Sequence, residues 1–164
     1  SNAVFIPYLQ RENIPNLTMA SPDIGGATRA RTYAKHLDGE LCLVNKHRPR
    51  PNEVGTMQII GEVKDRNVVI VDDIVDTAGT LCMAAEALME AGATSVRAVI
   101  THPLLSDNAQ EKIDASPISE LIVSNTIPLS NPIEKVKVLS IAQIFARALH
   151  KIYTHDSVSS LFLN

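Results

Sequence analysis

The segment from Asp72 to Thr80 combines acidic, hydroxyl-bearing and very small residues in the order Asp-Asp-Ile-Val-Asp-Thr-Ala-Gly-Thr. It follows the β-branched run 68–71, which predicts a buried strand, and precedes residues 80–91, whose apolar side chains recur at helical spacing. A bend of small residues between a strand and a helix can bind anions, because the first N–H groups of a helix are unpaired and partly positive. The segment therefore predicts a phosphate-binding bend.

Different residues of this bend suit different parts of a ligand, a phosphate group and a sugar. Close backbone approach and hydroxyl donors suit a phosphate, and the second half of the bend supplies them: Asp76, Thr77, Ala78, Gly79 and Thr80. Asp72 and Asp73 would repel a phosphate and suit sugar hydroxyls or a bound cation instead. The alternative is that Asp76 or Thr77 only caps the helix while the other acids solvate the end of the strand. Capping needs one residue and leaves the other acids, the threonines and the glycine unexplained.

Two other segments carry polar residues at the ends of expected strands. The first, 21–26, reads Ser-Pro-Asp-Ile-Gly-Gly, and its plain interpretation is a turn in which Gly25 and Gly26 supply positive φ before a helix. The second, 45–56, is basic and contains Pro49 and Pro51, which prevent a regular helix. We expect this second segment to be a mobile, exposed loop. By itself it would be a solvated surface.

The elements that must position these segments alternate between strands and helices. Strands are expected at 16–20, 41–44, 57–63, 68–71, 96–101, 120–124 and 136–139, and helices at 27–37, 80–91, 106–114 and 140–152. Residues 4–15 contain two prolines and no clear periodicity, so we expect only a lead-in segment there. Such alternation predicts an α/β fold with a mostly parallel, twisted sheet flanked by helices on both faces. The 164 residues, 45% of them hydrophobic and 4% aromatic, fit one domain with an aliphatic core.

Composition excludes several classes of function. The net charge of −3 and the pI of about 5.9 disfavour non-specific nucleic-acid binding, which needs a basic surface. No apolar run reaches the roughly 20 residues that a membrane helix needs, and no signal peptide is recognised, so we expect a cytoplasmic protein without a membrane partner. Cys42 and Cys82 are expected to be buried free thiols. Residues 1–3, Ser-Asn-Ala, are typical of the remnant of an expression tag, which leaves 4–164 as the domain.

In combination, the three polar segments resemble the C-terminal half of ribose-phosphate pyrophosphokinases, and the likeness extends over nearly all of residues 16–162. The resemblance implies a type I phosphoribosyltransferase-like fold. It implies that Asp72 and Asp73 hold the ribose 2- and 3-hydroxyls and that residues 76–80 wrap the 5-phosphate. Asp23 would help to hold Mg²⁺. Lys46 and Arg48 would be the catalytic pair of a flexible loop.

The same resemblance implies a reaction and partners. The diphosphoryl group of ATP would move to the 1-hydroxyl of ribose 5-phosphate, giving phosphoribosyl pyrophosphate and AMP. The family's chain is about twice as long, and its N-terminal half carries much of the ATP site, so this chain alone is expected to bind without turnover. The full-length enzyme would be a homo-oligomer, a hexamer of dimers. Residues 157–162 resemble the family's tail, which implies a regulatory phosphate site with Ser157, Ser159 and Phe162, unless the tail is only frayed.

Two alternatives to the synthetase remain open. A phosphoribosyltransferase would share the phosphate bend but would need a hood that binds a base, and no insertion rich in aromatic residues is visible for that purpose. A non-catalytic regulatory subunit would keep the fold, but it has no chemical need for Lys46, Arg48 and the acidic bend. The turn at 101–106 also resembles a family turn, but Asp107 and Asn108 depart from the family pattern, which puts any binding role there in doubt.

Overall fold

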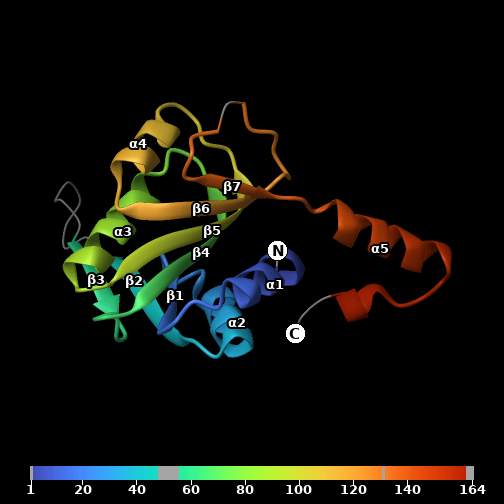
Figure 1. The fold of residues 1–164 in the computed structure, drawn as a ribbon, viewed down its shortest axis with the longest axis horizontal. Coiled ribbons are helices and arrows are strands. Elements are labelled where there is room, and N and C mark those ends of the chain that lie inside the picture. Colours follow the sequence, from blue (N-terminus) through green and yellow to red (C-terminus); the bar gives the residue numbers. More distant parts are fainter. Residues whose placement is uncertain (1, 48–55, 131, 162–164) are drawn as a thin grey trace.

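The computed structural model describes residues 2–47, 56–130 and 132–161, which form an α/β fold around a seven-stranded sheet (Figure 1). The sheet has the order β3-β2-β1-β4-β5-β6-β7, and its neighbours pair in parallel except for β2 with β3. The strands are β1 (Leu17–Ser21), β2 (Glu40–His47), β3 (Thr56–Ile60), β4 (Asn67–Val75), β5 (Ser95–Pro103), β6 (Ile118–Ser124) and β7 (Val136–Leu139). The prediction of a mostly parallel sheet is confirmed.

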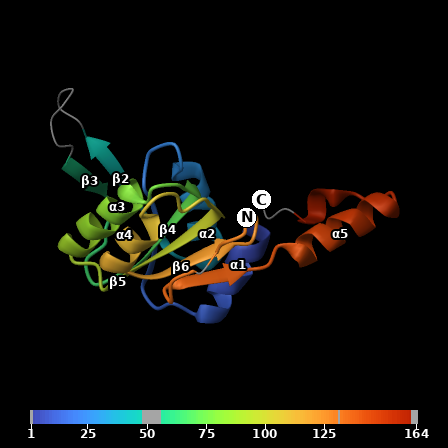
Figure 2. The same ribbon diagram turned by 90° about the horizontal axis from the view of Figure 1, so that it is seen from above.

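Helices cover both faces of the sheet, as predicted (Figures 1 and 2). They are α1 (Asn2–Glu12), α2 (Ala27–Leu37), α3 (Gly79–Glu90), α4 (Ala109–Ala115) and α5 (Ala142–Tyr153), followed by the 3-10 helix η1 (Val158–Leu161). Successive strand residues point to opposite faces. Val68 and Ile70 of β4 therefore pack with α3 and α4, whereas Val69 and Val71 pack with α1 and α2.

The lead-in segment expected at 4–15 is wrong, because residues 2–12 form helix α1. Pro7 inside this helix removes a hydrogen bond and costs about 3 kcal/mol. Four neighbouring side chains are buried against the sheet: Phe5, Ile6, Tyr8 and Leu9. Burying each large apolar side chain contributes about 1.5–3 kcal/mol, so packing outweighs the proline. The proline inside this helix thus obscured in the sequence a helix whose stability comes from tertiary contacts.

The loop expected at 45–56 is wrong for residues 45–47 and 56, which belong to strands β2 and β3. Strand β2 continues through His47, and Lys46 lies opposite Met57 of β3 in the antiparallel pair. Hydrogen bonding to β3 extends the strand beyond the apolar residues 41–44, where the sequence pattern ended it. Residues 48–55 lie outside the described residues. The same extension occurs in β4, which runs to Val75 rather than ending at residue 71.

Helix α5 confirms the helix expected at 140–152, but it extends away from the sheet and buries no residue (Figures 1 and 2). Phe145 and Tyr153 on this helix are 60% and 86% exposed. In the part of the chain that the structure describes, no helix is both long and apolar enough to cross a membrane. Cys42 and Cys82 are buried and free, as predicted.

Candidate functional site

The carboxyl ends of the adjacent strands β1 and β4 open into a pocket of about 240 Å³. Its lining consists of Asp23, Asp72, Ile74, Val75, Asp76, Thr77, Ala78, Gly79, Thr80, Leu81 and Ile100. In parallel α/β sheets this end of the strands is where ligands bind. The structure therefore brings the turn after β1 and the whole bend 76–80 to one cavity, although they are distant in the sequence. Asp73, predicted with Asp72, is exposed and does not line it.

The bend 76–80 presents backbone N–H groups that the protein does not use. Within the described ranges, the amides of these five residues donate to no protein acceptor. Helix α3 begins at Gly79, and the residue before it, Ala78, adopts a left-handed conformation with φ 61° and ψ 0°. No side chain caps the helix start, so the alternative in which Asp76 or Thr77 is simply a helix cap is wrong. Unpaired amides beside a pocket form a site for an anion.

Gly79 has no packing reason to be a glycine. A Cβ at this position would meet no described heavy atom within 4 Å, and its φ is not positive. Alanine favours a helix over glycine by up to about 1 kcal/mol. The space in front of residue 79 is open to the pocket, which permits close approach of a ligand to the backbone.

Asp72 and Asp73 share one arginine that the sequence analysis did not assign to the site. Arg29 of α2 places Nη1 2.8 Å from Asp72 Oδ1 and Nη2 2.8 Å from Asp73 Oδ2. Asp72 Oδ1 also accepts a hydrogen bond of 2.8 Å from the Asp73 amide. Arg29 and Asp72 are 43 positions apart in the sequence, so only the pairing of β1 with β4 brings them together. One feature of the sequence could have indicated this contact: Arg29 is a basic residue in the first turn of the helix that follows β1.

The environment separates the proton affinities of the two carboxyl groups. Burial raises the pKa of Asp72, and the neighbouring Asp73 carboxylate raises it further, against the opposing hydrogen bonds from the Asp73 amide and Arg29. Burial also acts on Asp73, but its hydrogen bond with Asp72 and the charge of Arg29 outweigh burial and lower the pKa of Asp73. On acidification, Asp72 is therefore the member of the pair that takes up the first proton.

Asp23 closes the turn between β1 and α2. Its Oδ1 accepts a hydrogen bond of 2.7 Å from the Gly26 amide, and Ser21 Oγ donates to the Asp23 carbonyl at 2.7 Å. The prediction that Gly25 and Gly26 supply positive φ is wrong, because Gly26 has φ −80° and neither glycine has positive φ. A side chain on Gly26 would instead collide with Ser21 Oγ. Residue 26 is therefore glycine because the turn leaves no room for a side chain there.

The structure does not build a complete metal site from protein groups. Across residues 2–47, 56–130 and 132–161, no three His, Cys, Asp or Glu side chains gather to hold an ion. Mg²⁺ is often held by one or two carboxylates, with the remaining ligands coming from water and substrate phosphates. Asp23 and Asp72, both in the pocket lining, fit that donor set.

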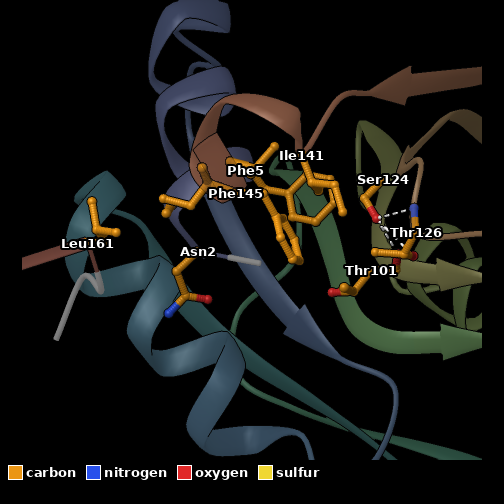
Figure 3. Close-up of a pocket in the computed structure, with 11 residues that line it drawn as sticks. Asn2, Phe5, Thr101, Ser124, Thr126, Ile141, Phe145 and Leu161 are labelled. Carbon is orange, nitrogen blue, oxygen red and sulfur yellow. Dashed lines mark hydrogen bonds between the residues drawn. The ribbon is translucent and has the colours of Figure 1, made fainter. Parts of the chain in front are cut away.

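Among the remaining predicted residues, the backbone of Lys46 lies in β2, and Arg48 lies outside the described residues. Ser157 and Ser159 are exposed, with Ser157 Oγ accepting the Ser159 amide at 3.2 Å, and Phe162 lies beyond the described part of the tail. The tail ends beside a different, largely apolar pocket of about 420 Å³ between α1, α5 and the carboxyl ends of β5 and β6. Figure 3 shows Phe5 and Phe145 in this second pocket, with Ser124 hydrogen-bonded to Thr126 at its edge.

Comparison with known proteins finds similarity to ribose-phosphate pyrophosphokinases and to phosphoribosyltransferases. A family model described as the phosphoribosyl synthetase-associated domain matches residues 43–163. A curated ribose-phosphate pyrophosphokinase from Campylobacter jejuni is 48% identical over 160 residues, which are 98% of this chain and 52% of that protein. The chain thus spans about half the length of the curated relatives that it matches.

Solved structures agree with this sequence match. The phosphoribosylpyrophosphate synthetase from Mycobacterium smegmatis superposes with a TM-score of 0.84 and 28% identity, covering 92% of this chain and 50% of that one. A purine phosphoribosyltransferase from Pyrococcus horikoshii has a TM-score of 0.52 and 21% identity, covering 84% of this chain and 85% of that one. At that identity the second likeness concerns the fold alone, and it confirms the expected type I phosphoribosyltransferase-like architecture.

Proposed function

Because the chain belongs to the family described as the phosphoribosyl synthetase-associated domain, we propose that it supplies the ribose 5-phosphate site and the catalytic loop of a ribose-phosphate pyrophosphokinase. In the proposed reaction, the 1-hydroxyl oxygen of ribose 5-phosphate bonds to the β-phosphorus of ATP. The bond between the α- and β-phosphoryl groups breaks, and the hydroxyl proton leaves. The products are phosphoribosyl pyrophosphate and AMP.

One observation carries the proposal: residues 76–80 line the pocket, and their amides donate to no acceptor among the described residues. In the proposed complex they donate to the 5-phosphate, together with the hydroxyl groups of Thr77 and Thr80. The positive end of the α3 dipole adds to the attraction. Gly79 leaves room for the phosphate, and the left-handed Ala78 turns the backbone at this point.

The other residues act on the sugar and the triphosphate. We assign Asp72 and Asp73 to the ribose 2- and 3-hydroxyls, which can donate to carboxylates, so that the 1-hydroxyl faces the β-phosphorus. Mg²⁺, when bound, would neutralise charge on the triphosphate, and Asp23 is the residue that we expect to help hold it. Lys46 and Arg48 would stabilise the charge that develops during transfer. Positioning and electrostatics supply the catalysis, and no covalent nucleophile is required.

Calorimetric titration of this chain with ribose 5-phosphate tests the proposal. We expect ribose 5-phosphate to bind and ribose not to bind, because ribose lacks the phosphate. Asp72→Ala should weaken the affinity about 10- to 100-fold, since a hydrogen bond to a charged group contributes about 1.5–3 kcal/mol. Asp65→Asn is the matched control: it removes an exposed acid at a left-handed position that asparagine tolerates. Wild-type affinity in Asp72→Ala would remove this residue from the site.

Two activity assays separate the proposal from its alternatives. With ATP and Mg²⁺ this chain alone should bind ribose 5-phosphate but form no useful amount of AMP. The full-length protein should form AMP, whereas a purely regulatory subunit should not. Exchange of purine or pyrimidine bases on phosphoribosyl pyrophosphate would instead indicate a phosphoribosyltransferase. For the full-length protein we also propose a homo-oligomer, which light scattering after size-exclusion chromatography would measure.

A further inference from the structure

The contact of Arg29 with the acid pair has an uncommon geometry. Its two terminal nitrogens contact different carboxylates, each at 2.8 Å, rather than both oxygens of one carboxylate. The side chain is 26% exposed, so most of it is held within the protein. A planar guanidinium that bridges two carboxylates sets the orientation of both, because its N–H groups point in defined directions.

This bridge determines which carboxylate oxygens remain for a ligand. Asp72 Oδ1 accepts hydrogen bonds from Arg29 Nη1 and from the Asp73 amide, and both of its lone pairs are therefore occupied. The other oxygen of Asp72 is left to serve the pocket that this residue lines. Without Arg29, the Asp72 carboxyl group would keep only the hydrogen bond from the Asp73 amide, which alone orients it less firmly.

We propose that Arg29 is a positioning residue for ribose 5-phosphate: it fixes the orientation of Asp72 and Asp73 so that their free oxygens face the sugar hydroxyls. This inference rests on the proposed function, since it concerns the same site. It assigns to α2 a part in sugar recognition that neither polar segment at the strand ends implies. Arg29 does not touch the substrate in this scheme and acts only through the two carboxylates.

Other charged groups near the pair do not replace this cation. Asp23 and Asp76 line the same pocket and add negative charge. His102 of β5 lies opposite Ile74 in the sheet, and its Nδ1 is 3.0 Å from Thr126 Oγ1. Lys112 of α4 donates to the Thr77 carbonyl at 3.2 Å. Among the described residues, Arg29 is the cation in contact with both carboxylates.

The experiment measures ribose 5-phosphate and inorganic phosphate affinities by calorimetry at pH 8. Arg29→Gln should weaken ribose 5-phosphate binding about 10-fold or more, while phosphate affinity changes less than about twofold, because only the sugar hydroxyls bind the carboxylates that Arg29 orients. Arg29→Lys keeps the positive charge but lacks the planar guanidinium that can bridge two carboxylates, so it should retain part of the affinity for ribose 5-phosphate. Arg31→Gln, an exposed arginine on the same helix, is the matched control and should match wild type.

The possible results separate this inference from the proposed function. Equal ribose 5-phosphate affinity in wild type and Arg29→Gln overturns the role of Arg29 and leaves the site itself intact. Equal loss of phosphate and ribose 5-phosphate affinity also overturns it, because the effect would then be structural. A wild-type protein that binds no ribose 5-phosphate overturns the proposed function. If Arg29→Gln does not fold, as judged by circular dichroism, Arg29→Lys decides by the same comparison, and unchanged affinity would refute the role.

Discussion

Replacing Gly79 with alanine should separate the stability of the bend from its ability to bind a ligand. The added methyl group meets no described heavy atom within 4 Å, and residue 79 is the first residue of α3. Alanine should therefore stabilise the fold by up to about 1 kcal/mol, which corresponds to a rise of about 2–4 °C in Tm for a chain of this size. The methyl group would, however, stand in the open space through which we expect the phosphate to approach the amides.

The expected loss of affinity follows from the hydrogen bonds that this methyl group blocks. One amide bond to a charged phosphate contributes about 1.5–3 kcal/mol, so its loss should weaken ribose 5-phosphate binding about 10- to 100-fold. Calorimetry measures the affinity, and thermal unfolding by circular dichroism measures Tm on the same sample. The variant should thus become more stable or unchanged while it loses its ligand.

Gly92→Ala is the matched control, because it should have the reverse effects. Gly92 has φ 96°, and a Cβ there would lie 3.3 Å from Lys64 Cγ, so alanine should cost about 1–2 kcal/mol of stability. It lies just after α3, away from the residues that line the pocket, and ribose 5-phosphate affinity should not change. If Gly79→Ala binds ribose 5-phosphate as tightly as wild type, the phosphate does not lie against residue 79 and the proposed pose is wrong.

Two further predictions concern residues elsewhere in the chain. Lys46→Ala in the full-length protein should lower turnover by orders of magnitude while ribose 5-phosphate still binds, and Lys64→Ala should leave turnover unchanged; normal turnover in Lys46→Ala would discard its catalytic role. Burial raises the pKa of Cys42 to about 11 and also raises the pKa of Cys82. Because the thiolate is the nucleophile, neither thiol should react with iodoacetamide at pH 8 until the protein is unfolded, and rapid labelling of the native protein, read by mass spectrometry, would contradict their burial.

Local patterns were sufficient for most of the sheet and for the four helices α2, α3, α4 and α5. The β-branched run 68–71 has a strong preference for a buried strand, and the apolar spacing in 80–91 and 27–37 suits helices regardless of the rest of the chain. Element ends were less predictable, because they depend on a partner. β4 continues through the polar Asp72 because this residue pairs with Ile100 of β5. In the same way, β2 continues to His47 because its last residues pair with β3.

Helix α1 shows a second limit of local reasoning. Its sequence contains a proline and only a weak pattern, and the helix exists because Phe5 and Leu9 are buried against a sheet face that forms from residues far along the chain. A propensity evaluated within eleven residues contains no information about that face. Packing energy from distant strands outweighed the local preference, as is usual for short helices.

The sequence by itself determined the chemistry of the bend, because residue types and their order along a strand, turn and helix are local properties. Small residues, threonines and acids between 72 and 80 indicate a sugar-phosphate site in any fold that ends a strand there. Only the tertiary structure decided that Arg29 bridges Asp72 and Asp73 and that Asp23 shares their pocket. These contacts depend on β1 lying next to β4, and strand order results from the packing of the whole sheet, which no short segment encodes.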